Sequence, residues 1–236
     1  MGGTPVQNVG AYGQEVSQTI SRVRALEIAT GATVELSNAE CGFTYRISRF
    51  NTTARDKYIV LEVAYLLQRN GKPAIEYADL ENFFAGHTGP SPTLQQVRDA
   101  VRSIRRSKAM LLVPGDEDCR SAGSFFKNPV ISEAEAARVQ SLAEKRVPGK
   151  ILPRYPAENG HVKLSAAWLV EQAGFAKGYT RGPVGISRKH TLAIVNRGGA
   201  TARDILALKE EVQQKVFDTW GVTLDSEPVF VGFTHP

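Results

Sequence analysis

Alternating hydrophobic and polar residues near the start of the chain predict a β-hairpin and a further strand. Residues 20–28 and 32–36 each alternate between apolar and polar side chains, and Gly31 lies in the turn between them. Residues 57–67 are rich in β-branched and aromatic side chains, which favour strands. The first half of the chain is therefore predicted to be rich in β-structure.

From residue 93 onward, hydrophobic residues recur at helical spacing. In residues 93–106, an apolar stripe is formed by Leu94, Val97, Val101 and Ile104. The other positions of this helix include Arg98, Arg102, Arg105 and Arg106. Most of these arginines are interpreted as a solvated basic face. Arg105, and Lys108 just beyond it, lie near the helix end and are the stronger candidates for ligand contacts. Ser132 and Glu135 have the spacing of a capping box and predict the start of another helix.

The later segments predict a mixture of helices and short strands. Residues 148–160 contain several prolines and glycines and predict a loop. Helices are predicted at residues 163–174, with Trp168 in the core and Gly174 at the C-terminal end, and at residues 201–219. Short strands are predicted at residues 191–196 and 229–233. The chain is therefore interpreted as a β-rich lobe and an α+β lobe that meet near residues 110–120.

Composition narrows the class of protein. Hydrophobic residues make up 42% and charged residues 22%, and no apolar run is long enough to span a bilayer, so a soluble protein is expected. The opening Met-Gly-Gly-Thr-Pro-Val-Gln does not have the pattern of a secretory signal. Cys41 and Cys119 have no metal-ligand spacing and fit a reducing cytoplasm, and we expect no bound metal.

Net charge leaves several classes of partner open. Lys and Arg number 29 against 24 Asp and Glu, a mild excess that phosphorylated small molecules suffice to explain. The basic residues are not interleaved with aromatic residues, so nucleic-acid binding is the weakest hypothesis. Residues 1–16 are rich in glycine, and such segments expose backbone N–H groups that can cradle a phosphate or a planar ring.

The most distinctive polar segment is residues 121–129, Ser-Ala-Gly-Ser-Phe-Phe-Lys-Asn-Pro. Gly123 permits positive φ or a close backbone approach, and Pro129 fixes the direction in which the chain leaves. We interpret the segment as a stiff turn that presents Ser124 at the floor of an active site. The alternative is an ordinary polar turn, because no GxSxG elbow surrounds the serine.

Five separated motifs together resemble one known family. They are residues 5–13, 41–46, 121–129, 163–172 and 227–228, and they occur in the same order as in the UDP-N-acetylenolpyruvoylglucosamine reductase (MurB) family of cell-wall biosynthesis. The similarity extends from residue 4 to near residue 230. Tyr77 looks like the substrate-clasping tyrosine of the first type of this family. Each motif alone is modest, and the ordered set carries the resemblance.

The resemblance implies a cytoplasmic, monomeric flavoenzyme without nucleic-acid or membrane partners. Such an enzyme uses NADPH to reduce FAD and then reduces UDP-N-acetylglucosamine enolpyruvate to UDP-N-acetylmuramate, a step of peptidoglycan synthesis that links it to cell shape and division. The implied fold class is α+β. Residues 1–112 would be the C-terminal part of a FAD-binding lobe, residues 113–221 a substrate-binding domain, and residues 222–236 a strand that carries Glu227 back to the FAD lobe.

The resemblance also implies roles for individual residues. Ser124 would protonate the substrate carbon, and Arg46 and Glu227 would stabilise the enolate. The implied contacts of the UDP-sugar are Tyr77, Lys108 and Asn128. The implied contacts of the flavin are Gly10, Ala11, Tyr12, Tyr45 and Arg105.

Alternatives remain for some of these positions. Arg46 and Glu227 also fit a simple surface ion pair, and Asn128 also fits a cap on a turn. Lys163, Arg188 and His190 fit structural roles as well as functional ones.

The sequence departs from the family at its start. The family carries a portion ahead of Thr4, with a Gly-rich loop for the flavin diphosphate, and this sequence is expected to be a late start or a fragment. Substrate binding is less affected than FAD binding, because the serine segment is complete. A flavin-free or inactive UDP-sugar-binding fragment is therefore the alternative function.

Overall fold

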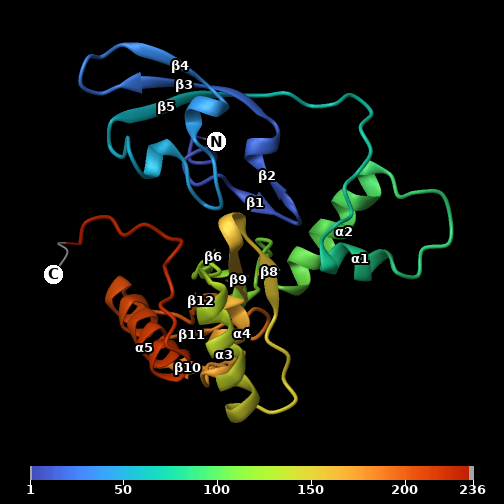
Figure 1. The fold of residues 1–236 in the computed structure, drawn as a ribbon, viewed down its shortest axis with the longest axis vertical. Coiled ribbons are helices and arrows are strands. Elements are labelled where there is room, and N and C mark those ends of the chain that lie inside the picture. Colours follow the sequence, from blue (N-terminus) through green and yellow to red (C-terminus); the bar gives the residue numbers. More distant parts are fainter. Residues whose placement is uncertain (1, 234–236) are drawn as a thin grey trace. The chain divides into compact units, whose positions relative to one another are not determined.

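A computed structural model describes residues 2–233 of the chain. The chain forms two compact units, one up to Ile104 and one from Arg105 onward. This division lies before the domain boundary that the sequence predicts after residue 112. Each unit has its own sheets and its own hydrophobic core, and the two are described separately (Figure 1).

The first unit contains an antiparallel sheet in the order β4-β3-β5. Strand β3 (Ile20–Glu27) pairs with β4 (Thr33–Ser37) and with β5 (Tyr58–Tyr65), which confirms the predicted hairpin and the predicted third strand. Val23 and Ala25 of β3 point into a core that also contains Cys41 and Phe50. A second hairpin pairs β1 (Gly10–Ala11) with β2 (Gln14–Glu15).

Two α-helices follow this sheet. They are α1 (Ala78–Phe84) and α2 (Leu94–Ser107), and α2 confirms the helix predicted at residues 93–106. Buried Leu80, Ala100 and Ile104 form a small core between them. Short 3₁₀ helices are η1 (Val16–Gln18), η2 (Ala39–Cys41), η3 (Arg49–Asn51), η4 (Glu117–Cys119) and η5 (Glu158–Gly160).

The second unit contains two antiparallel sheets. One has the order β10-β11-β12-β6, formed by β10 (Thr180–Arg181), β11 (Val184–Ile186), β12 (Ala193–Asn196) and β6 (Ser121–Ser124). The other has the order β7-β9-β8, formed by β7 (Val130–Ser132), β9 (His161–Leu164) and β8 (Arg154–Pro156). Strand β12 confirms the strand predicted at residues 191–196.

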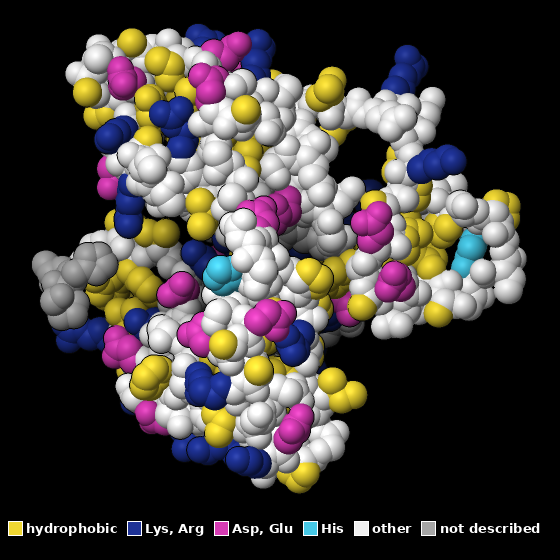
Figure 2. Space-filling view, in the orientation of Figure 1, with side chains coloured by type: hydrophobic (Ala, Val, Ile, Leu, Met, Phe, Trp, Pro, Cys, Tyr) yellow, Lys and Arg dark blue, Asp and Glu magenta, His cyan; other side chains and the backbone are white. Residues whose placement is uncertain are grey.

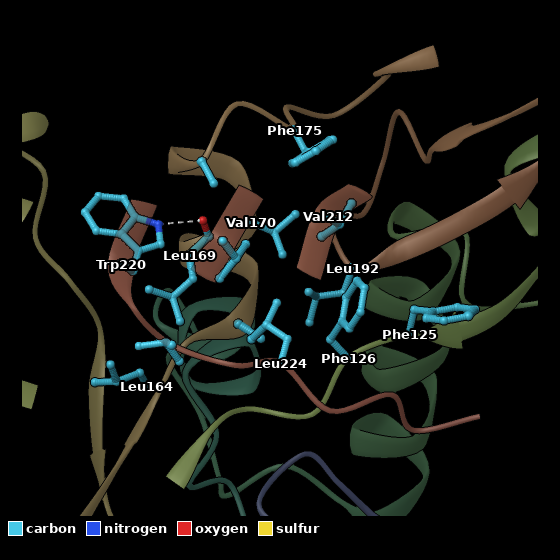
Figure 3. Packing of buried hydrophobic residues seen from close by; sticks show 14 of the residues in the cluster. Phe125, Phe126, Leu164, Leu169, Val170, Phe175, Leu192, Val212, Trp220 and Leu224 are labelled. Carbon is cyan, nitrogen blue, oxygen red and sulfur yellow. Dashed lines mark hydrogen bonds between the residues drawn. The ribbon is translucent and has the colours of Figure 1, made fainter. Parts of the chain in front are cut away.

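Three α-helices cover these sheets: α3 (Glu133–Arg146), α4 (Ala166–Gln172) and α5 (Ala202–Trp220). The predicted capping box is present, since Ser132 accepts from the Glu135 N–H and Glu135 accepts from the Ser132 N–H. Helix α5 packs against β11 and β12, and α3 against β7 and β9. The core between them is shown in Figure 3, where the Trp220 indole donates to the Leu169 carbonyl at 3.0 Å.

The structure corrects four sequence predictions. Residues 121–124 form strand β6 and not a turn, because they pair with β12. The predicted loop at residues 148–160 contains strand β8. The helix predicted from Lys163 begins later, because residues 163 and 164 belong to β9 and Ser165 caps α4. Residues 229–233 form no strand, and residues 234–236 of the predicted C-terminal segment lie outside the described residues.

The described residues hold no candidate metal site and no helix able to span a membrane. Between residues 2 and 233, no group of three or more His, Cys, Asp or Glu side chains is placed to hold a metal ion. Over the same range, every helix is too short or too polar to cross a bilayer. Figure 2 shows that Lys and Arg side chains on one face are interspersed with Asp and Glu.

Candidate active site

Ser124 lies at the end of β6, where its side chain meets His190. The Ser124 Oγ is 3.0 Å from the His190 Nε2, and both residues are half-buried. Ser124 pairs with Ala193 of β12, and the Phe125 N–H donates to the Leu192 carbonyl at 2.8 Å. This pairing brings the residues just before β12 to the end of β6. Gly123 has φ +86°, so the positive φ expected there is present.

The loop that carries His190 is held by buried polar groups. Ser187 is fully buried, and its Oγ accepts from the backbone N–H groups of Lys189 at 3.0 Å and His190 at 3.3 Å. Asp118, of which 2% of the side chain is exposed, accepts from the Arg188 backbone N–H and from the Arg188 Nε, both at 2.9 Å. The turn before β6 therefore anchors the loop before β12.

Asp118 is stabilised in its ionised form. Burial raises the pKa of its carboxyl, but the hydrogen bonds from the Arg188 N–H, the Arg188 guanidinium and the Ser187 hydroxyl, together with the guanidinium charge, outweigh burial. The net result is a pKa below the ordinary value for Asp. The buried carboxylate thus fixes the position of the Arg188 backbone.

Glu227 is brought beside the serine segment by backbone pairing. The Glu227 N–H donates to the Phe125 carbonyl at 2.9 Å, and the Lys127 N–H donates to the Asp225 carbonyl at 2.9 Å. Phe126 and Ser226 form the β-bridge between these two bonds. Two of the three predicted catalytic residues, at positions 124 and 227, therefore lie on adjoining backbone segments of one unit.

Asn128 supports the local fold of the same region. Its Oδ1 accepts from the Ala166 N–H at 2.9 Å, at the first residue of α4. This hydrogen bond satisfies one of the backbone N–H groups that the helix start leaves without an intrahelical partner. The alternative that Asn128 caps a structural element therefore has direct support, and a contact from its other amide atom to a UDP-sugar remains a proposal.

Arg105 and Lys108 lie on a segment that reaches β6. The Arg105 Nη2 donates to the Met110 carbonyl at 2.7 Å. The Met110 Cε lies 4.0 Å from the position that a Cβ on Gly123 would occupy. Lys108 lies between these two contacts in the chain, immediately after α2, so both predicted ligand contacts belong to the unit that contains Ser124.

The other predicted site residues belong to the first unit. The Arg46 Nη2 donates to the Gly10 carbonyl at 2.8 Å, and the Arg46 Nη1 donates to the Asn8 carbonyl at 3.4 Å. A Cβ at Gly10 would lie 2.9 Å from the Arg46 Nη1, so glycine is what allows this approach. The Arg46 guanidinium also lies 5.2 Å from the centre of the Tyr45 ring.

Two of these residues adopt backbone conformations that side chains disfavour. Arg46 has φ +59° and Tyr12 has φ +54°, in the left-handed region. Such conformations cost on the order of 1–3 kcal/mol each and concentrate at functional sites. The Tyr12 ring meets the Tyr77 ring edge-on at 5.5 Å, so a predicted flavin contact touches a predicted substrate contact.

The hairpin from Gly10 to Glu15 carries three of the predicted flavin contacts, Gly10, Ala11 and Tyr12. Its turn contains Tyr12 and Gly13, both with positive φ, and Ala11 and Gly13 are exposed. The space beside Gly10 is filled by the Arg46 guanidinium, the Glu15 side chain and the Gln14 carbonyl, all within 3.2 Å of where a Cβ would lie. The exposed turn, and not the Gly10 face, is therefore the part of the hairpin open to a ligand.

The predicted residues thus fall into two groups, one in each unit. The group of the first unit contains Gly10, Ala11, Tyr12, Tyr45, Arg46 and Tyr77, and the group of the second contains Arg105, Lys108, Ser124, Asn128 and Glu227. Sequence reasoning left His190 open between a structural and a functional role, and missed Asp118 and Ser187. The available signal was the polar run of residues 187–190 directly before a predicted strand.

Known proteins are similar to this chain in sequence and in fold. Residues 114–231 match the family model described as "UDP-N-acetylenolpyruvoylglucosamine reductase, C-terminal domain". That range contains the pairing of Phe125 with Glu227 and the Ser124–His190 contact. A crystal structure of UDP-N-acetylenolpyruvylglucosamine reductase (MurB) from Thermus caldophilus has a similar fold, with a TM-score of 0.55 at 24% identity. It covers 96% of this chain and 58% of that one, and supports the fold alone.

The fold defines a class of mixed helix and sheet, and the family model assigns residues 114–231 to a reductase C-terminal domain family. Named relatives are closer in sequence. The UDP-N-acetylenolpyruvoylglucosamine reductases of Thermobifida fusca and Streptomyces avermitilis are 52% and 47% identical, over 99% and 98% of this chain. The chain belongs to the UDP-N-acetylenolpyruvoylglucosamine reductase family. It spans 66% and 64% of the length of these two relatives.

Proposed function

We propose that this chain acts in the NADPH-dependent reduction of UDP-N-acetylglucosamine enolpyruvate to UDP-N-acetylmuramate, a step of peptidoglycan precursor synthesis. The observation that carries the proposal is the backbone pairing of Phe125 with Glu227 directly after Ser124. This pairing brings the backbone segments that carry Ser124 and Glu227, from distant parts of the chain, next to each other. The reaction needs a proton donor and a group that stabilises an enolate.

Ser124 is the proposed proton donor. Hydride addition to the enolpyruvyl double bond leaves negative charge on the carbon that bears the carboxylate. This enolate is basic enough to take a proton from a hydroxyl that is held in contact with it. Glu227 and Arg46 are the proposed enolate-stabilising groups, and the Arg46 guanidinium suits the two oxygens of a carboxylate.

FAD is the proposed cofactor, and when bound it supplies the hydride. Gly10, Ala11, Tyr12 and Tyr45 would hold its ring end, together with Arg105. The exposed turn at Ala11 and Gly13 supports this assignment, because it leaves backbone of the hairpin open to a ligand. Tyr77, Lys108 and Asn128 are the proposed contacts of the UDP-sugar.

The test combines a spectrum with an assay. The purified chain, mixed with FAD and desalted, should retain a yellow flavin absorbance band. It should then oxidise NADPH in proportion to added UDP-N-acetylglucosamine enolpyruvate. The Thermobifida fusca relative, purified in the same way, is the positive control. Retained flavin without substrate-dependent oxidation of NADPH would contradict the proposal.

A flavin-free or inactive UDP-sugar-binding fragment is the second candidate. The serine-bearing unit favours it, because this unit folds around a core of its own. Calorimetry with UDP-N-acetylglucosamine separates the two candidates. Heat of binding in a colourless sample that does not oxidise NADPH supports the fragment, and retained flavin with turnover supports the reductase.

A further inference from the structure

We infer that His190 is the positioning residue of Ser124, and that its Nε2–H donates a hydrogen bond to the Ser124 Oγ. The inference rests on the proposed function, in which Ser124 gives a proton to carbon. It adds a residue outside the set of proposed catalytic groups. The observation that carries it is the 3.0 Å separation of the Ser124 Oγ and the His190 Nε2.

The direction of this hydrogen bond follows from what Ser124 has to do. A serine hydroxyl has one proton and two acceptor lone pairs. If the His190 Nε2 accepted that proton, the hydroxyl would be directed at the imidazole and away from any substrate. If Nε2–H donates instead, it occupies a lone pair and leaves the hydroxyl proton to point elsewhere. A serine that protonates carbon therefore requires the donating form of His190.

The same hydrogen bond stabilises the product of proton transfer. The transfer breaks the Ser124 O–H bond and forms a C–H bond on the substrate carbon. The electron pair of the broken bond stays on Oγ as an alkoxide, and a proton from water later restores the hydroxyl. A hydrogen bond to a charged oxygen is stronger than one to a neutral hydroxyl, so the His190 Nε2–H contact strengthens as the charge develops.

The backbone around His190 is built to keep the ring in place. The His190 N–H donates to the buried Ser187 Oγ at 3.3 Å, and the His190 carbonyl accepts from the Ala193 N–H at 3.1 Å. Asp118, in η4 just before β6, holds the Arg188 backbone two residues before His190. The ring therefore sits on a loop that is tied at both of its ends to the sheet containing Ser124.

The first experiment reads the hydrogen bond directly and needs no cofactor. Imidazole ¹⁵N spectra of the 236-residue chain should show His190 protonated at Nε2, and Ser124→Ala should shift the His190 Nε2 signal while leaving that of His161 in place. His161 is an exposed histidine of the same unit, and its Nδ1 contacts a backbone carbonyl. An unprotonated Nε2 on neutral His190, or an unshifted signal in Ser124→Ala, would overturn the inference.

The second experiment uses the substitution series His190→Gln, His190→Ala and His161→Gln. Glutamine retains an N–H donor, so His190→Gln should keep most of the rate of substrate reduction. His190→Ala should lower that rate about 10- to 100-fold, from the loss of a hydrogen bond to a charged oxygen. Reduction of bound flavin by NADPH should be unchanged in all three variants.

The outcomes separate this inference from the proposed function. Equal rates in His190→Ala and wild type, or equal losses in His190→Gln and His190→Ala, would overturn the donor role. A wild-type chain that reduces no substrate would overturn the proposed function. In that case the ¹⁵N spectra still decide whether the His190 Nε2–H donates to Ser124.

Discussion

Glu227 donates its backbone N–H to the carbonyl of Phe125 at 2.9 Å, one residue beyond Ser124. The two residues are about a hundred positions apart in the sequence, and the bond is part of a short antiparallel pairing with Phe126 and Ser226. The carboxyl of Glu227 is thus carried by a segment whose register is fixed against the serine. Anything that loosens the segment should affect the chemistry of both residues.

Replacing Ser124 with Ala should separate the two half-reactions. Reduction of bound flavin by NADPH should remain near the wild-type rate, because Ser124 takes no part in it. Reduction of the enolpyruvyl substrate should slow about 10²- to 10⁴-fold, the usual contribution of a general acid. Stopped-flow absorbance measures both rates, and Ser121→Ala on the same strand is the matched control. An equal loss in both half-reactions would remove the proton-donor role.

Replacing Phe230 with Ala should loosen the segment that carries Glu227. Phe230 packs against the core, with its ring 6.3 Å from that of Phe125 and 5.5 Å from the Lys209 Nζ. Loss of this partly buried ring should lower the free energy of unfolding by about 1–3 kcal/mol. Substrate reduction should slow as well. Phe217→Ala on the exposed face of α5 is the control for urea unfolding, and equal effects of both variants would contradict the anchoring role of Phe230.

Asp118 should make stability depend on pH in the acid range. Its lowered pKa means that the ionised carboxyl stabilises the folded state above the unfolded pKa of about 4, and that this contribution is lost as the pH falls through the folded pKa. Asp118→Asn should lower the free energy of unfolding at pH 7 and flatten its decrease between about pH 5 and pH 3. Urea titrations across this range measure it, with Glu117→Gln as control. Parallel curves for wild type and Asp118→Asn would contradict this assignment.

Cys41 should resist alkylation in the folded chain. Burial raises the pKa of its thiol to about 11, despite the nearby Arg49 charge, and none of its surface is exposed. Little thiolate is present at pH 8, and the thiolate is the reactive form. Mass spectrometry after iodoacetamide treatment should find Cys41 unlabelled in native protein and labelled in urea. Rapid labelling of the native chain would show that the surrounding core opens readily.

Local patterns in the sequence were sufficient for the elements with strong periodicity. The hairpin of residues 20–36 and the helix of residues 201–219 were found because each shows its period over many residues, and the capping box at Ser132 is a local signal. Strand β8 was missed because prolines and glycines surround it, and β9 because its last residues continue into a helical pattern. Leu164 also has the spacing of a helical stripe, but pairing of β9 with distant β7 determines its conformation.

The candidate site was predicted less completely than the fold. The resemblance to a family supplied Ser124 and Glu227. The turn expected around the serine is a strand because it pairs with β12. This partner lies about seventy residues later, so no local pattern indicated it. The position of His190 depends on that same pairing. Asp118 and Ser187 have no sequence signal of their own, since their role comes from burial against each other's segments.

The contact between positions 10 and 46 couples the effects of substitutions at the two positions. A Cβ at position 10 would lie 2.9 Å from the Arg46 Nη1, while the Arg46 Nη2 is bound to the carbonyl of residue 10 itself. Gly10→Ala would therefore displace the guanidinium if it occurred first, whereas a shorter side chain at position 46 would make room for it. The effects of the two substitutions on the free energy of unfolding should therefore be non-additive.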